Sequence, residues 1–185
     1  MSGNRETVLR LIRELAVMNG GDFELASGER SAVYIDLRRV TMHPLGASAI
    51  GHMIHDRLAD TGVDSVGGMA TAAIPVVTAV VCESQRRSVP VRGFYVRDKA
   101  KTRGTQRRIE GLLEEGDKVV LLEDTMTTGQ STMAAVEAVR EAGATVVRVI
   151  TVVDRLRGGA ALFADSGISF EALFTLDGIT GDGRP

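Results

Sequence analysis

The fold is decided by the stretch Val119-Val120-Leu121-Leu122-Glu123-Asp124-Thr125-Met126-Thr127-Thr128-Gly129-Gln130-Ser131-Thr132. Its first four residues are apolar, as in a strand that is covered on both faces of a parallel sheet. Two carboxylates follow, then a loop rich in Thr and Gly, and then a helix predicted over residues 130–142. Because ligands of open α/β sheets bind at the carboxyl ends of strands, we expect a binding site at this point.

Strands and helices alternate on both sides of this stretch. The predicted strands are 63–66, 89–96, 146–153 and 170–176, and the predicted helices are 74–83 and 158–166. Alternation of this kind predicts an α/β fold with a central parallel sheet flanked by helices. The N-terminal part alternates less clearly, with helices predicted at 4–19 and 44–58 and short strands at 23–25 and 33–37.

We therefore expect a single domain over residues 1–185. Its core is predicted at roughly 41–166, and a small hood is predicted from the N- and C-terminal segments at roughly 1–40 and 167–180.

Composition excludes several classes of partner. The chain has 22 basic and 24 acidic residues and a net charge of −2, so we expect no general attraction to nucleic acid or to a membrane surface. No apolar stretch reaches the ~18 residues that a membrane span needs, and we expect no secretory signal. The single Cys82 excludes an internal disulfide and favours a cytoplasmic location. It stands in the apolar run 76–82, which predicts an inert thiol in the core.

The loop after the two carboxylates is suited to a phosphate monoester. It offers backbone N–H groups, several hydroxyls and the N-terminus of a helix. Glu123 and Asp124 are suited to accept hydrogen bonds from a ribose diol beside that phosphate. Together these features predict a ribose 5-phosphate site, although for Asp124 alone a helix N-cap is an equally good interpretation. Neither a Walker loop nor a Gly-x-Gly-x-x-Gly fingerprint occurs in the chain.

A second candidate segment is strongly basic. Between residues 97 and 108 there are six cations and one acid, Asp98. The cations are Arg97, Lys99, Lys101, Arg103, Arg107 and Arg108. Such a segment has little apolar surface with which to pack, so we expect it to move until an anion such as pyrophosphate arrives. A solvated basic loop without a ligand is the alternative. His52 and His55 have no third ligand near them in the sequence, and we predict no protein metal site.

The decisive stretch resembles the motif with which type I phosphoribosyltransferases bind 5-phosphoribosyl 1-pyrophosphate (PRPP). Three further segments resemble the orotate phosphoribosyltransferase family in particular. Residues 23–38 match its Ser-Gly turn and aromatic strand, residues 96–111 match its mobile catalytic loop, and residues 152–155 end in an arginine that meets the orotate carboxylate in the family. The matches follow the order of the family from about residue 20 to residue 176.

The resemblance implies the type I phosphoribosyltransferase fold and transfer of the phosphoribosyl group from PRPP to orotate, in pyrimidine biosynthesis. It implies Mg²⁺ carried by PRPP, and a homodimer in which the loop reaches the neighbouring site. Lys101 and Asp124 match catalytic residues, and Thr127 and Arg155 match orotate contacts. The implied PRPP contacts are Arg97, Lys99, Lys101, Arg103, Glu123, Asp124, Thr125, Met126, Thr127, Thr128, Gly129, Gln130 and Ser131.

Four positions depart from the family pattern. Asp98 stands where the family has lysine, Arg103 replaces a histidine, Ala72 replaces a lysine of the pyrophosphate loop, and Ala26 replaces a lysine near the base. Three hypotheses therefore remain open at this point: a phosphoribosyltransferase for orotate, one for another base, and a non-catalytic regulatory protein that senses PRPP.

Overall fold

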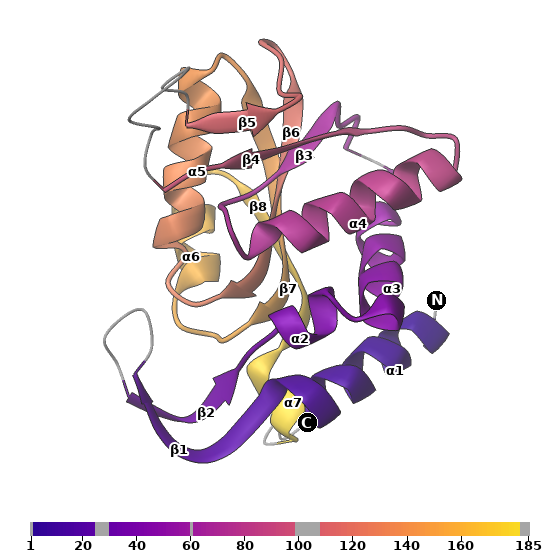
Figure 1. Ribbon diagram of the computed structural model, residues 1–185. Coiled ribbons are helices and arrows are strands. Elements are labelled where there is room, and N and C mark those ends of the chain that lie inside the picture. The colour runs from indigo at the N-terminus through magenta and orange to yellow at the C-terminus, as the bar shows by residue number, and fades with distance from the viewer. Residues whose placement is uncertain (1, 25–29, 60, 99–107, 182–185) are drawn as a thin grey trace.

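The computed structural model describes residues 2–24, 30–59, 61–98 and 108–181. A six-stranded sheet forms its centre, with the strand order β5-β4-β3-β6-β7-β8 (Figure 1). The strands are β3 (Ser65–Gly67), β4 (Arg92–Val96), β5 (Ile109–Gly111), β6 (Lys118–Met126), β7 (Thr145–Asp154) and β8 (Ser169–Thr175). All neighbouring pairs are parallel except β4 and β5. The predicted α/β class is thus confirmed, and β6 lies in the middle of the sheet.

Helices cover both faces of this sheet. Helices α5 (Gln130–Glu141) and α6 (Gly159–Asp165) lie on one face, and α3 (Pro44–His55) and α4 (Ala73–Arg86) lie on the other (Figure 1). The side chains of β6 alternate between the two layers, as period-two strand geometry requires. Val119 and Leu121 pack in the cluster that includes α5, whereas Val120 and Leu122 pack in the cluster that includes α3 and α4.

The N-terminal segment forms a small separate layer. Helix α1 (Ser2–Leu11) continues into a π-helical turn, η1 (Ile12–Ala16), and then into an antiparallel pair of strands, β1 (Val17–Glu24) and β2 (Arg30–Ile35). The predicted helix therefore ends earlier than Asn19, because the chain is already extended from Val17. A short helix, α2 (Arg38–Thr41), leads from β2 toward α3.

The C-terminal segment divides between the two parts. Strand β8 pairs with β7 and is an edge of the central sheet, although the sequence placed it with the hood. The last helix, α7 (Leu176–Thr180), does meet the N-terminal segment, since Arg13 Nε donates to the carbonyl of Ile179 at 2.8 Å. The division into hood and core at the predicted residues stays a prediction.

Cys82 is exposed, so the expected position in the core is wrong. The reason is that its apolar run belongs to α4, a helix with one packed face. Val76, Val77 and Val80 are buried on that face, and Cys82 lies outside it. Within the described ranges no helix is long and apolar enough to span a membrane.

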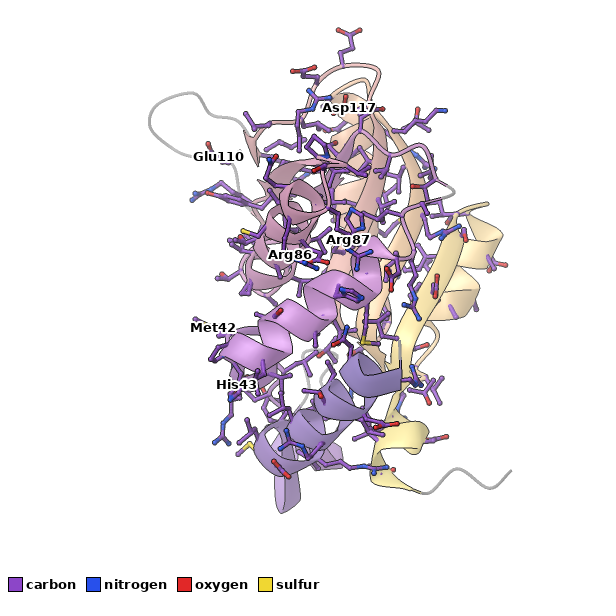
Figure 2. All side chains as sticks on the ribbon, turned by 90° about the vertical axis from the view of Figure 1, so that its right-hand side faces the viewer. Met42, His43, Arg86, Arg87, Glu110 and Asp117 are labelled. Carbon is purple, nitrogen blue, oxygen red and sulfur yellow. The ribbon has the colours of Figure 1, made fainter. Side chains whose placement is uncertain are left out.

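His52 is part of a charged network between α3 and α4. His52 Nδ1 lies 3.1 Å from Glu83 Oε1 and 2.6 Å from Arg87 Nη2. Arg86 and Arg87 both donate to Glu83, which holds the pKa of that carboxyl down to about 2. Figure 2 shows both arginines beside α3, with Met42 and His43 at the other end of that helix. Among the residues with described positions, no group of three His, Cys, Asp or Glu side chains could hold a metal ion.

Candidate active site

The carboxyl end of β6 carries two buried acids in contact. Glu123 is 7% exposed and Asp124 is 8% exposed. The backbone N–H of Asp124 donates to Glu123 Oε1 at 3.2 Å. Burial, followed by the charge of Asp124, raises the pKa of Glu123 to about 8. Burial likewise raises the pKa of Asp124. The pair therefore holds a proton at neutral pH until a ligand enters.

This shared proton predicts a pH dependence of stability. Glu123 in an unfolded chain loses its proton near its ordinary pKa of 4.5, whereas in the folded chain it keeps the proton up to about pH 8. Between these values the folded state binds more protons, so the free energy of unfolding falls as the pH rises. Each unit of pKa shift corresponds to ~1.4 kcal/mol. Between pH 5 and pH 8 the free energy of unfolding of the parent chain should therefore fall by a few kcal/mol more than that of the Glu123→Gln variant.

Urea unfolding at several pH values measures this difference. Glu141→Gln, a change at an exposed carboxylate of α5, serves as the control and should follow the parent chain. Parallel pH curves for the parent and Glu123→Gln would show that Glu123 is already ionised in the folded state.

A cavity of about 300 Å³ opens beside this pair. Its lining contains the loop after β6 and the first turn of α5. The residues are Met69, Ala70, Ala72, Glu123, Thr125, Met126, Thr127, Thr128, Gly129, Gln130, Ser131 and Thr132. Gly129 precedes α5 with a φ of 85°, in the left-handed region that glycine adopts without strain. None of the described groups accepts a hydrogen bond from the N–H groups of Thr127, Thr128 or Gly129. These donors and the helix N-terminus suit a phosphate.

Met126 also lines the cavity. Its side chain is buried and lies against Gly159, where an added Cβ would approach Met126 Cγ to 2.6 Å. Its carbonyl accepts the N–H of Arg155 at 2.9 Å, and the carbonyl of Thr127 accepts the N–H of Gly159 at 3.2 Å. The segment after β7 therefore holds the phosphate loop in place.

Residues 68–75 resemble the pyrophosphate loop of the family. Met69, Ala70 and Ala72 of this segment form the facing wall of the cavity. The N–H of Ala70 donates to the carbonyl of Val96 at 2.7 Å, and the N–H of Val96 donates to the carbonyl of Gly68 at 2.8 Å. A Cβ at Gly68 would lie 2.2 Å from the carbonyl oxygen of Leu122, so only glycine allows this approach to β6. Ala72 lies in the cavity wall, which places that departure from the family pattern inside the site.

Arg155 and Thr127, the predicted orotate contacts, lie on neighbouring segments. Arg155 is 7% exposed, and burial, followed by repulsion from Arg157, lowers the pKa of its guanidinium. Tyr34, near the end of β2, is close enough to interact electrostatically with Arg155. The N-terminal strand pair, although far away in sequence, therefore reaches the same site.

Two charged residues at the start of α2 were missed by sequence reasoning. Arg38 Nε donates to Asp36 Oδ1 at 2.7 Å, and both residues interact electrostatically with Asp124. The available signal was their position directly after the aromatic strand that contains Tyr34. Thr132 was missed as well: it is buried and donates to Glu123 Oε2 at 2.9 Å.

The basic segment is described only at its ends. Arg97 follows β4, and its N–H donates to the carbonyl of Arg108 at 2.7 Å, so the two ends of the segment are joined. Asp98 is exposed. Three predicted PRPP contacts, Lys99, Lys101 and Arg103, lie outside the described residues, as does Ala26.

Comparison with known proteins agrees with this geometry. A family model described as a phosphoribosyl transferase domain matches residues 37–166. A curated orotate phosphoribosyltransferase of Nostoc sp. is 44% identical over 173 residues, which are 93% of this chain and 83% of the relative. A solved phosphoribosyltransferase of Corynebacterium diphtheriae has a TM-score of 0.85 at 38% identity, over 97% of this chain and 99% of that chain.

A second solved structure is the orotate phosphoribosyltransferase of Mycobacterium tuberculosis in complex with PRPP. It has a TM-score of 0.80 at 33% identity, over 96% of this chain and 99% of that chain. The similarity thus covers nearly the whole chain, including the two carboxylates, the phosphate loop and the N-terminal strands. The chain belongs to the phosphoribosyl transferase domain family and, within it, to the orotate phosphoribosyltransferases.

Proposed function

We propose that this protein transfers the 5-phosphoribosyl group of PRPP to orotate, which gives orotidine 5'-phosphate and pyrophosphate in pyrimidine biosynthesis. The observation that carries the proposal is the buried Glu123–Asp124 pair at the end of β6, followed directly by a loop with free backbone N–H groups at the N-terminus of α5. The names of relatives up to 44% identical support orotate as the base.

The 5-phosphate of PRPP binds in the cavity of residues 125–131. There the N–H groups of Thr127, Thr128 and Gly129 and the exposed hydroxyls beside them donate to the phosphate oxygens. The ribose hydroxyls donate to Asp124 and Glu123, which as carboxylates are acceptors alone. The α5 helix dipole favours the negative phosphate further.

Orotate binds on the Arg155 side of the pair. Its carboxylate meets the guanidinium of Arg155, a charge-assisted contact that is strong because the arginine is buried. Thr127 lies one residue after the carbonyl that accepts the Arg155 N–H, so its polar groups are near the same ligand. This arrangement predicts faster conversion of orotate, which has a carboxylate, than of bases that lack one.

In the reaction the C1–O bond to pyrophosphate breaks, and pyrophosphate leaves with the electron pair. The ring nitrogen of orotate forms the new bond to C1 from the opposite face and loses its proton. Lys101 and the other cations of residues 97–108 stabilise the charge on the departing pyrophosphate. Closure of this segment over the site excludes water, which would otherwise capture the cationic ribosyl carbon.

Mg²⁺ enters with PRPP and offsets the charge of the pyrophosphate oxygens. The donor set fits this arrangement, because Glu123 and Asp124 are oxygen ligands of the type that Mg²⁺ prefers, but a dedicated protein cage would need more of them. Within the described residues no third carboxylate or imidazole completes such a cage. We therefore assign no residue of the chain as a direct metal ligand.

The proposed assembly is a cytoplasmic homodimer with shared active sites. An apolar groove of about 620 Å³ lies along α4 and offers a second copy a surface on which to pack. Its walls include Met42, Ile74, Pro75 and Ala79, and Met42 is 72% exposed. Ile74 and Pro75 follow the loop that lines the phosphate cavity, so a partner bound in this groove is close to the site.

Mixed dimers test whether the sites are shared. If Lys101 acts in the partner's site, dimers that combine one Lys101→Ala chain with one Arg155→Gln chain contain one intact site. Random pairing of the two chains after joint refolding then restores about a quarter of the parent activity. At orotate concentrations well below the parent KM, each variant refolded alone should keep only a small fraction of the parent activity. Sites built within single chains would give no recovery in the mixture, because both chains then carry a damaged site.

The activity itself is tested by the ultraviolet absorbance of orotate. We expect the absorbance to fall when the protein, PRPP and Mg²⁺ are all present, and to stay constant when any one is left out. Orotate that remains unchanged while PRPP binds would overturn the proposal and would favour the non-catalytic alternative.

A further inference from the structure

The carboxyl group of Glu123 is held on both of its oxygens. Thr132, in the first turn of α5, donates its hydroxyl to Oε2 at 2.9 Å, and the Asp124 N–H donates to Oε1 at 3.2 Å. Thr132 is 1% exposed, so water does not compete for this contact. The two hydrogen bonds leave Glu123 a single orientation in the cavity wall.

The contact follows from the alternation of β6. Val119 and Leu121 face the layer of α5, and Glu123 continues that face two residues further on. Its carboxyl therefore lies beneath the N-terminus of α5, where Thr132 follows the phosphate-binding residues. A side chain at residue 132 with no donor would leave Oε2 without this partner.

The position of the Thr132 hydroxyl also affects where the proton of the acidic pair is held. Two carboxyl groups in contact without a cation cannot both be ionised at low cost, so the Glu123–Asp124 pair shares a proton. An oxygen that already accepts a hydroxyl proton is a poor place for a proton of its own. Oε2 accepts the shorter of the two hydrogen bonds, 2.9 Å from Thr132 against 3.2 Å from the Asp124 N–H at Oε1, so the proton is held at Oε1.

We propose that Thr132 is a positioning residue of the active site: it orients Glu123 through Oε2 and directs the shared proton to Oε1. Asp124 is then the carboxylate that accepts a ribose hydroxyl when PRPP enters. The role of Asp124 toward the ribose rests on the proposed function, whereas the position of the proton on Glu123 does not.

The other charged groups around the pair do not distinguish the two oxygens of Glu123. Arg38 and Asp36, next to the start of α2, interact electrostatically with Asp124. Arg38 lowers the pKa of Asp124, whereas Asp36 raises it. The first turn of α5 contains no acid, and residues 69–72 of the facing wall contain no titratable side chain. Thr151 of β7 directs its hydroxyl to backbone carbonyls. In the part of the chain that the structure describes, the hydroxyl of Thr132 is the closer of the two donors to Glu123, at 2.9 Å from Oε2 against 3.2 Å from the Asp124 N–H to Oε1.

The kinetic test compares Thr132→Val, which keeps the side-chain shape, with Thr132→Ser, which keeps the hydroxyl. We expect Thr132→Val to lower kcat/KM for PRPP roughly tenfold, the upper end of the effect of losing one neutral hydrogen bond, with KM for orotate unchanged. Its pH profile should move to higher pH, because the lost hydrogen bond favoured the ionised form of Glu123. Thr132→Ser should restore both properties.

A second measurement is independent of turnover. Carbon-13 NMR follows the titration of the glutamate carboxyl groups without PRPP, with Glu123 assigned by its absence in Glu123→Gln. The Glu123 midpoint should rise in Thr132→Val and return in Thr132→Ser. Thr41→Val is the matched control, since that buried hydroxyl lies outside the phosphate cavity and has no hydrogen-bond partner among the described atoms.

A Glu123 midpoint that is equal in the parent and Thr132→Val overturns the inference, as does an equal loss of kcat/KM in the valine and serine variants. If the parent chain fails to convert PRPP, the proposed function is wrong, but the NMR titration still decides the role of Thr132.

Discussion

Replacement of Lys101 by alanine is expected to lower kcat by about 10²- to 10³-fold, the typical effect of removing one preorganised donor from a developing negative charge. The lysine matches the catalytic lysine of the family in the basic segment, and pyrophosphate gains charge as the C1–O bond breaks. The KM for orotate should change little, because the proposed orotate contact is Arg155, outside this segment. Initial rates at saturating PRPP and orotate measure the effect.

Lys118→Ala is the matched control for this variant. Lys118 is an exposed lysine at the start of β6, at the end of the strand opposite to Glu123 and Asp124, and its loss should leave kcat unchanged. Equal activity of the Lys101→Ala variant and the parent would show that another cation of residues 97–108 carries the catalytic role, and the resemblance at this position would then be misleading.

Replacement of Arg155 by glutamine is expected to raise the KM for orotate by about 10- to 100-fold, because a charge-assisted hydrogen bond contributes roughly 1.5–3 kcal/mol. Glutamine is shorter and neutral, so the orotate carboxylate would enter a buried site without its counter-charge. The KM for PRPP should remain close to that of the parent. Steady-state kinetics with each substrate varied in turn separate the two effects.

Arg157→Gln removes the same charge two residues further on and serves as the control. Arg157 is exposed, so a similar increase of the orotate KM in both variants would point to long-range attraction rather than to direct contact by Arg155. An unchanged KM in Arg155→Gln would place orotate elsewhere in the cavity.

The central layer could be predicted from sequence because its strands are apolar on both faces. Residues 119–122 and 146–153 form near-continuous apolar runs, and each is followed by a helical pattern with a clear end. The short elements β5, α2 and α7 were not predicted, since three to five residues give too little periodicity. Strand β4 begins later than predicted, at Arg92, because the N–H groups of Val89 and Val91 donate to Ser84 of α4 and not to a neighbouring strand.

The position of the candidate site could also be predicted from the sequence, because a buried strand that ends in two acids and a Thr-Gly loop is typical of a ribose 5-phosphate site. The residues that contact this site from distant parts of the sequence could not be predicted. Arg38 and Asp36 lie near Asp124 because the N-terminal strands fold onto the sheet, and no local sequence pattern predicts this interaction. The role of Thr132 depends on the orientation of one carboxyl group, which only the packing of α5 against β6 determines.

Two of the four departures from the family pattern, Ala72 and Asp98, lie in the described residues, and they fall in different places. Ala72 lines the phosphate cavity, where the absence of a lysine removes one positive charge near pyrophosphate. Asp98 lies exposed at the start of the basic segment, so its charge can remain in water while the neighbouring cations meet the ligand. Both changes leave Arg155 and Thr127, the proposed orotate contacts, in place, so we expect them to affect the rate more than the choice of base.

The measurement that tests the central claim most directly is kcat/KM for orotate beside hypoxanthine, guanine, adenine and uracil, each with PRPP and Mg²⁺. A buried arginine that pairs with the substrate carboxylate predicts a preference for orotate of about 10⁴-fold or more, as sites built to pair a polar substrate group achieve. Faster conversion of any other base would contradict the assignment of orotate. Conversion of none, with PRPP still bound, would contradict catalysis itself.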